Sequence, residues 1–173
     1  GDQVEVGDGS SLKLLIHDNS VVDVGAGSQM VIESSDRKHS KILLSVLEGK
    51  VRATVTRKPS AKETPFKIRT RSTVAGVRGT QFLISSQTSR DGVVSSSVHC
   101  LSGRIEVRDM SGRQVADLRP MMAVSTNAAV LHGQMSLIGQ PPQARPITPE
   151  AAKNLKSERF IETREMPDQA RAG

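Results

Sequence analysis

The chain of 173 residues carries a net charge of +6 and is 36% apolar, with three phenylalanines and neither tryptophan nor tyrosine. This length suits one domain, or one domain plus a tail, that can bury a hydrophobic core without disulfides or metal. The scarcity of aromatic rings argues against sugar-stacking and single-strand nucleic-acid surfaces, and the single cysteine, Cys100, excludes an intrachain disulfide.

The first part of the chain alternates apolar and polar residues with the period of two that is typical of β-strands. Clusters of turn residues at 7–10, 17–20 and 25–28 separate these stretches. Short strands with regularly spaced turn signals predict an all-β fold. Gly49 interrupts the strand-like stretch 41–58 and suits either a hairpin turn or a bulge.

A short sequence echo suggests a structural repeat. The sequence LSGRIEV at 101–107 shares the pattern Leu-x-Gly-basic-branched with LEGKVRATV at 47–55. The echo fits a fold that uses the same corner twice.

The stretch TVAGVRGTQF at 73–82 has two readings. Either Gly76 and Gly79 expose Arg78 as a ligand contact, or they let the backbone bend while Arg78 caps carbonyls or pairs with a carboxylate. We favour the structural reading, because a planar guanidinium can tie several carbonyls together. It predicts that Arg78→Lys destabilises the domain by about 1–3 kcal/mol. Thr80 and Phe82 then resume the inward alternation of a strand.

The character of the chain changes after residue 138. Four prolines fall within 139–150, which predicts an extended linker or arm. A helix should follow, with Thr148 as the N-cap and Pro149 at its first position. We therefore expect an all-β domain over 1–138 and an arm with a C-terminal helix over 139–173, and the helix could dock on the domain or on a partner.

The sequence contains no recognisable catalytic, cofactor or metal motif. His17, Asp18 and Ser20 fall in one tight turn, where they cannot align as a triad. His99 and Cys100 are neighbours on a strand and should point to opposite faces, with Cys100 a small buried hydrophobe. The four histidines have no metal-ligand spacing. We expect a non-enzymatic protein without a cofactor.

Several motifs, in order, resemble the FecR domain family, named for the iron-dicitrate sensor and regulator of bacterial envelopes. The opening GDQVEV with LLIHDNS, the central LLSVLEGKVRATV, and PFKIRTRSTVAGVRGTQFLI match the family pattern, and closing strands extend the likeness to roughly residues 2–125. Asn19 and the pair Pro120–Met121 depart from glycine-containing family positions, so the last corner could differ. The motif residues are Asp18, Arg78, Gly79, Thr80 and Phe82.

The resemblance implies an all-β stack of short strands, β-helix-like or sandwich-like. It also implies a binding, signalling or scaffolding module of the cell envelope that acts through a protein partner, with cell-wall polymer as a second candidate partner, and not through catalysis. We expect a periplasmic or otherwise extracytoplasmic location, with any signal sequence outside residues 1–173, and no membrane span, since no window approaches about 18 apolar residues.

An alternative function is the binding of an anionic polymer, either cell-wall glycan or, less expected, nucleic acid. Residues 37–81 contain twelve Lys and Arg against two Glu. Such an excess could attract phosphates, although it is also typical of the solvated face of alternating strands. The candidate residues of this anionic-ligand face are Arg52, Lys67, Arg69 and Arg71.

Overall fold

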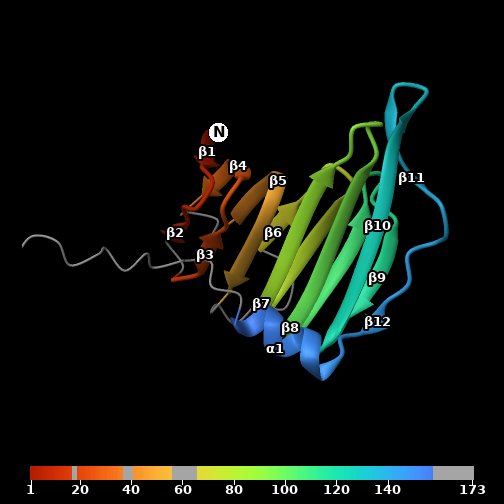
Figure 1. The fold of residues 1–173 in the computed structure, drawn as a ribbon. Helices are drawn as coiled ribbons and strands as arrows, with labels where there is room; N and C mark the ends of the chain where they lie inside the picture. Colours follow the sequence, from red (N-terminus) through yellow and green to blue (C-terminus); the bar gives the residue numbers. More distant parts are fainter. Residues whose placement is uncertain (17–18, 37–40, 56–65, 158–173) are drawn as a thin grey trace, which may run out of the picture.

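A computed structural model describes residues 1–16, 19–36, 41–55 and 66–157 (Figure 1). These residues form strands and one short C-terminal helix, which confirms the all-β prediction. The elements are β1 Asp2–Val6, β2 Leu12–Leu15, β3 Val21–Val24, β4 Ser28–Asp36, β5 Lys41–Thr54, β6 Phe66–Arg69, β7 Thr73–Thr88, β8 Val94–Asp109, β9 Gln114–Leu118, β10 Met122–Leu131, β11 Gln134–Ile138, β12 Arg145–Pro146 and α1 Pro149–Ser157.

Hydrogen bonding joins these strands into one continuous sheet that folds over on itself. The pairings divide it into a first sheet, in the order β1-β4-β5-β6-β7-β8-β9, and a second sheet, in the order β2-β3-β5-β7-β8-β10-β11. Among the described strands, β5 and β6 are the only pair that runs in parallel. Three strands, β5, β7 and β8, run through both sheets and span 14, 16 and 16 residues. They are longer than the sequence led us to expect because each continues through a bend.

Glycines mark the bends of β5 and β8. Gly49 has a φ of 91° and Gly103 a φ of 84°, a region that only glycine enters readily. The inward-facing residues have even numbers before Gly49, as in Leu44 and Val46, and odd numbers after it, as in Val51 and Ala53. Gly49 therefore lies at a bulge within β5 and not in a hairpin turn.

The repeat suggested by the sequence is present in the backbone pairing. In the first copy Met30 pairs with Val46, and in the second Phe82 pairs with Cys100. The neighbouring pairs Gln29–Glu48 and Ile32–Leu44 correspond in the same way to Gln81–Ser102 and Ile84–Val98. The strands β3 to β5 and the strands β7 and β8 thus form two copies of one unit.

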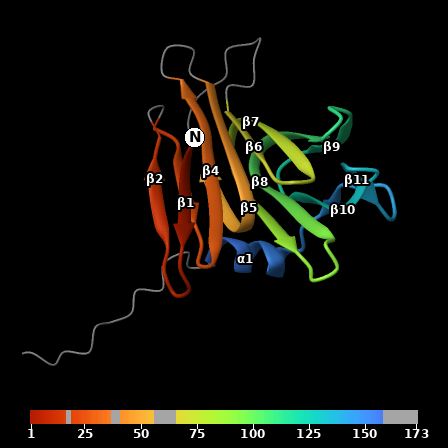
Figure 2. The same ribbon diagram turned by 90° about the horizontal axis from the view of Figure 1, so that it is seen from above.

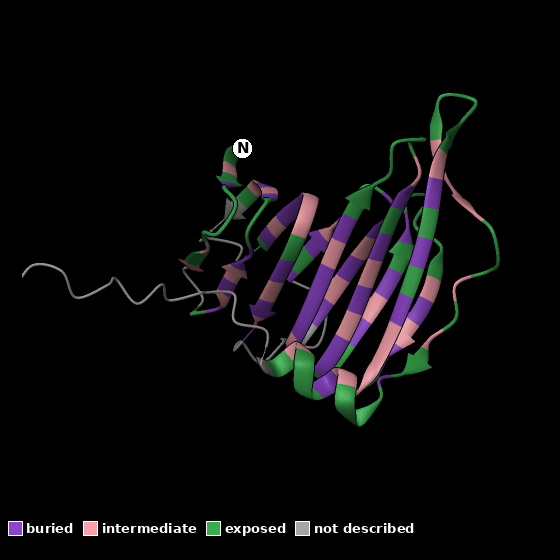
Figure 3. Ribbon diagram, in the orientation of Figure 1, coloured by how far each residue is buried: buried purple, intermediate pink, exposed green. Residues whose placement is uncertain are grey.

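The core fills the space between the two sheets. Phe66 of the first sheet meets Phe82 of the second edge to face, with ring centroids 6.5 Å apart. Both rings are buried among valines, leucines and isoleucines of the two inner faces. Figure 3 shows the resulting alternation of buried and exposed residues along the strands, as the period of two predicts.

The C-terminal arm lies against the second sheet. Its strand β12 pairs with the start of β10, and the Ile147 amide donates to the Met121 carbonyl at 2.7 Å. Thr148 caps α1 by accepting a hydrogen bond from the Ala151 amide at 3.3 Å, as predicted. Figures 1 and 2 show α1 beside the ends of β7 and β8.

Side chains tie this helix to the domain. Ala152 is buried, and the guanidinium of Arg52 donates a hydrogen bond to the Leu155 carbonyl. Leu83 and Leu101 belong to the outer face of the second sheet, yet only 2% and 5% of their surfaces are exposed. We attribute their burial to the helix, so α1 docks on its own domain.

Candidate functional site

The family motif forms part of a corner. Gly79 has a φ of 56°, and Thr80 and Phe82 are buried. The Thr80 hydroxyl donates to the Arg104 carbonyl at 3.2 Å, next to the second glycine bend. In the first copy the Ser28 hydroxyl plays the same part by donating to the Lys50 carbonyl at 3.3 Å, and it also accepts a hydrogen bond from the Lys50 amide at 3.0 Å. Asp18 and the side chain of Arg78 lie outside the described part of the structure.

The four candidate residues of the anionic-ligand face do not form one cluster. Lys67 and Arg69 lie on the outer face of the first sheet, whereas Arg52 belongs to the second sheet beneath α1. Arg71 follows the end of β6 and donates to the Thr88 hydroxyl at 3.4 Å.

Most of these cations already have partners in the protein. Arg69 forms an ion pair with Glu33 and donates to the Ser45 hydroxyl at 2.8 Å. Farther along the same face, Arg104 and Arg108 pair with Asp117 and Glu106. The sequence-based count of positive charges therefore overstates the free positive charge on this face.

The cysteine has the buried environment that the sequence predicts. Burial raises the pKa of the Cys100 thiol to about 11, so the reactive thiolate is disfavoured. Within the described ranges, no group of histidine, cysteine, aspartate and glutamate side chains is arranged to hold a metal ion. In the same ranges, no helix is long and apolar enough to cross a membrane.

A cluster of five buried hydroxyls closes one end of the core. It consists of Thr70, Ser72, Thr73, Ser96 and Thr126. The Ser72 hydroxyl lies 2.7 Å from the Ser96 hydroxyl and 3.1 Å from that of Thr126, which links the first sheet to the second. Such a network satisfies polar groups that would otherwise be costly to bury.

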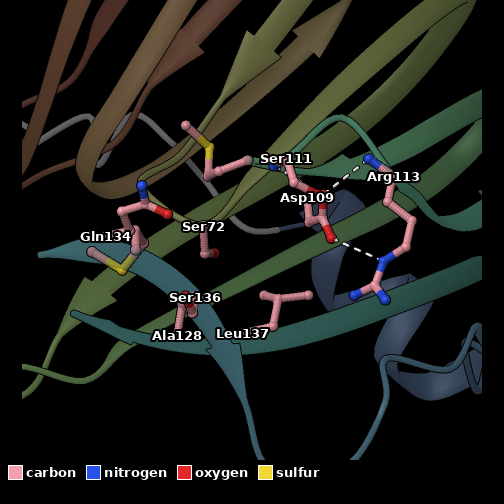
Figure 4. Close-up of a pocket in the computed structure, with 10 residues that line it drawn as sticks. Ser72, Asp109, Ser111, Arg113, Ala128, Gln134, Ser136 and Leu137 are labelled. Atoms are coloured by element: carbon pink, nitrogen blue, oxygen red, sulfur yellow. Dashed lines mark hydrogen bonds and ion pairs between the residues drawn. The ribbon is translucent and has the colours of Figure 1, made fainter. Parts of the chain in front are cut away.

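Beyond this hydroxyl cluster the two sheets separate at what we call the open end. There the turn 109–113 of the first sheet faces the β10–β11 hairpin of the second, and a pocket of about 750 Å³ lies between them (Figure 4). The open-end pocket is lined by Ser72, Asp109, Met110, Ser111, Arg113, Ala128, Gln134, Met135, Ser136 and Leu137.

Asp109 fixes the turn at the rim of this pocket. Its carboxylate accepts hydrogen bonds from the amide and hydroxyl of Ser111, at 3.0 and 2.6 Å, and from the Arg113 amide at 3.0 Å. Burial alone would raise the pKa of Asp109, but these bonds outweigh it and hold that pKa below its usual value.

Large apolar residues are exposed around the open end. Three of the five exposed large hydrophobic residues in the described ranges belong there, namely Met110, Val130 and Leu131. Val130 pairs with Met135 across the hairpin, and Met110 and Met135 both line the open-end pocket. No motif or spacing in the sequence marks these three residues. The adjacent apolar pair Val130–Leu131 beside a turn was the available signal, but the pairing of Val130 with Met135, which lines the pocket together with Met110, depends on the fold.

The comparisons with known proteins agree with this architecture. Two crystal structures of a candidate anti-sigma factor from Parabacteroides distasonis, at 1.65 and 2.50 Å resolution, resemble this chain with a TM-score of 0.67 and 20% sequence identity. Each likeness covers 90% of this chain but 63% and 62% of those chains, so the present chain spans less than two thirds of their length. At this identity the likeness establishes a shared fold.

No curated protein sequence matches the chain significantly. The profile of the family described as FecR protein matches residues 2–106, which include both glycine bends, the motif at Arg78–Phe82 and the core of both sheets. Since this match spans more than half of the 173 residues, the chain belongs to the FecR family.

Proposed function

We propose that this chain is a non-enzymatic regulatory module of the bacterial envelope that binds a protein partner through its open end. Membership of the FecR family supports a signalling or regulatory role. The solved structures of similar fold come from a candidate anti-sigma factor, which is also a regulatory kind of protein. By analogy with the family, the location is periplasmic or otherwise extracytoplasmic.

The observation that carries this proposal is the exposure of apolar side chains at one end of the fold. Met110 is 43% exposed, Val130 62% and Leu131 46%. Gathered apolar side chains on a soluble protein mark surfaces that become covered by a partner. Because the hairpin extends past the hydroxyl cluster, the partner would pack against Met110 and against Val130 on the hairpin's inner face without disturbing the core. Leu131, the next residue of the strand, lies on the opposite face of the hairpin.

The C-terminal arm is a less suitable contact. Ala152 of its helix is buried, Arg52 of the second sheet donates to the Leu155 carbonyl, and β12 pairs with β10. Detaching the arm would expose apolar surface and break backbone pairing. We therefore assign the partner to the open end, with the arm serving to cover the second sheet.

The test is site-specific photo-cross-linking with the full-length protein in its own bacterium. A photoreactive residue at Val130 or Met110 should give the same discrete protein adduct, recovered with the extracytoplasmic fraction. The matched control is Lys67, an exposed residue on the outer face of the first sheet. An adduct formed from Lys67 alone would refute the open end as the contact surface, and the absence of any protein adduct would refute a protein partner.

A further inference from the structure

The open-end pocket combines an apolar wall with a polar one. Met110, Met135 and Leu137 supply thioether and aliphatic surface, while Ser111, Gln134 and Ser136 are among its polar lining residues. Figure 4 shows Ser111 on the turn 109–113 across the pocket from Ser136 and Leu137 of β11. A volume of about 750 Å³ is within the usual range for ligand pockets and has room for two or three side chains.

Arg113 offers a charged group at the rim of the pocket. Its side chain is 73% exposed, and its Nε donates to Asp109 Oδ2 at 3.1 Å. Among the described residues, no hydrogen bond engages its two terminal nitrogens. Since Ser111 and Arg113 already occupy the Asp109 carboxylate, the terminal edge of the guanidinium is available for a carboxylate from outside.

The charges nearby favour an anionic group. Arg108 pairs with Glu106 and donates to the Gly112 carbonyl at 2.7 Å, so it also lies beside this turn. Arg71 follows β6 one residue before Ser72, which lines the pocket. The carboxylates beside the turn, Glu106 and Asp109, are already held by arginines, and Glu48, near Arg71, accepts hydrogen bonds from the Thr88 amide. The terminal nitrogens of Arg113 are therefore the group at the rim that would attract an acidic side chain.

We propose that the open-end pocket binds a short extended segment of the partner in which an acidic residue stands beside large apolar residues. The carboxylate would bind the terminal nitrogens of Arg113, and an apolar side chain would enter between Met110, Met135 and Leu137. This proposal rests on the proposed function and names the chemistry of the partner. Alternate acidic and apolar side chains of an extended segment point to opposite sides, which suits a pocket with a charged rim and an apolar wall.

The experiment uses NMR amide shifts of the chain with the blocked peptide acetyl-Ser-Leu-Glu-Leu-Ser-amide as the probe. The amides of Ser72, Ser111 and Ser136 should shift on titration. Arg113→Gln should weaken the Kd about tenfold, as expected for loss of a charge-assisted hydrogen bond. The matched control is Arg119→Gln, an exposed arginine of the β9–β10 turn that does not line the pocket, and it should change the Kd by less than about twofold.

A second probe separates the carboxylate from the apolar contacts. Replacing glutamate by glutamine in the peptide should weaken binding to the unaltered chain by the same factor, with no further loss in Arg113→Gln. Equal losses in Arg113→Gln and Arg119→Gln, shifts confined to another surface, or no binding of the probe would overturn the pocket proposal. In that case, a cross-link from Val130 to a protein partner would still support the proposed function. If the probe binds but Val130 forms no protein adduct, the proposed function is refuted instead. If the oligomeric state of the chain changes during the titration, the proposal of a peptide segment is overturned, and the occupant of the pocket is a second copy of this chain.

Discussion

Replacing Gly103 by alanine should cost far more than replacing a glycine of similar backbone conformation that has open space around it. A Cβ at Gly103 would lie 2.5 Å from the Gly79 carbonyl oxygen and 2.9 Å from Thr80 Cα. Both neighbours are backbone atoms, so a side chain cannot rotate away to relieve the contact. The φ of 84° adds the cost of a left-handed conformation, about 1–2 kcal/mol for a residue with a Cβ.

Displacing the neighbouring strand adds about 1–3 kcal/mol, the usual range for overpacking a core. We therefore expect Gly103→Ala to lower the free energy of unfolding by about 2–5 kcal/mol, a large part of the roughly 5–15 kcal/mol typical of a domain. The assay is equilibrium unfolding in urea, in which the midpoint should fall while the slope stays constant.

Two glycines of this chain serve as matched controls. Gly112 has a φ of 86°, but a Cβ at this position would meet nothing within 4 Å, so Gly112→Ala should show the conformational cost of about 1–2 kcal/mol alone. Gly7 has open space and no left-handed φ, and Gly7→Ala should have little effect. If Gly103→Ala costs no more than Gly112→Ala, the close approach of the two strands is not a source of stability and the reasoning fails.

Four further predictions concern other parts of the molecule. Arg78→Lys should lower the free energy of unfolding by about 1–3 kcal/mol; an unchanged melting temperature with lost partner binding would favour the ligand-contact reading instead. Asp109→Asn should destabilise the domain at pH 7 and much less below pH ~3, because a carboxylate with a lowered pKa contributes stability above its unfolded pKa and loses it as the pH falls through its folded pKa. Urea titrations at both pH values would show this, and equal losses would contradict it. Ala152→Lys should detach α1 and speed hydrogen exchange of amides around Leu83, with Lys153→Ala, on the exposed side, as the control. Heparin binding should be weak, salt-dependent and reduced by Lys67→Ala, since Arg52, Arg69 and Arg71 are engaged within the protein; tight binding that ignores salt would contradict this.

The strands were predictable because alternation is a local property. Pairs such as Val22 and Val24, or Ile42 and Leu44, lie on the inner face as the period of two requires. The bend at Gly49 was not decided by sequence, because glycine suits both a hairpin turn and a bulge. Its contact with Ser28, far away in the chain, determines the outcome.

The sequence indicates that a strand is covered on both faces, but it does not indicate that α1 provides the cover. Phe82, Leu83 and Ile84 are consecutive apolar residues, and such a run is typical of a strand covered on both faces. The run does not say what covers the second face. The open end was less predictable still, because the residues around its pocket come from separate segments that only the folded topology brings together.

The two glycine bends are each held by a hydrogen bond from a buried hydroxyl, so two segments of the same chain can be compared with each other. The segments Gly27-Ser28-Gln29-Met30 and Gly79-Thr80-Gln81-Phe82 occupy equivalent places, so the features they share are those that the architecture demands. Ala26 precedes Gly27 in the first bend where Arg78 precedes Gly79 in the second, which shows that the bend can form without an arginine. The residue before the glycine is thus the place where the two bends differ, although their backbone pairing is the same.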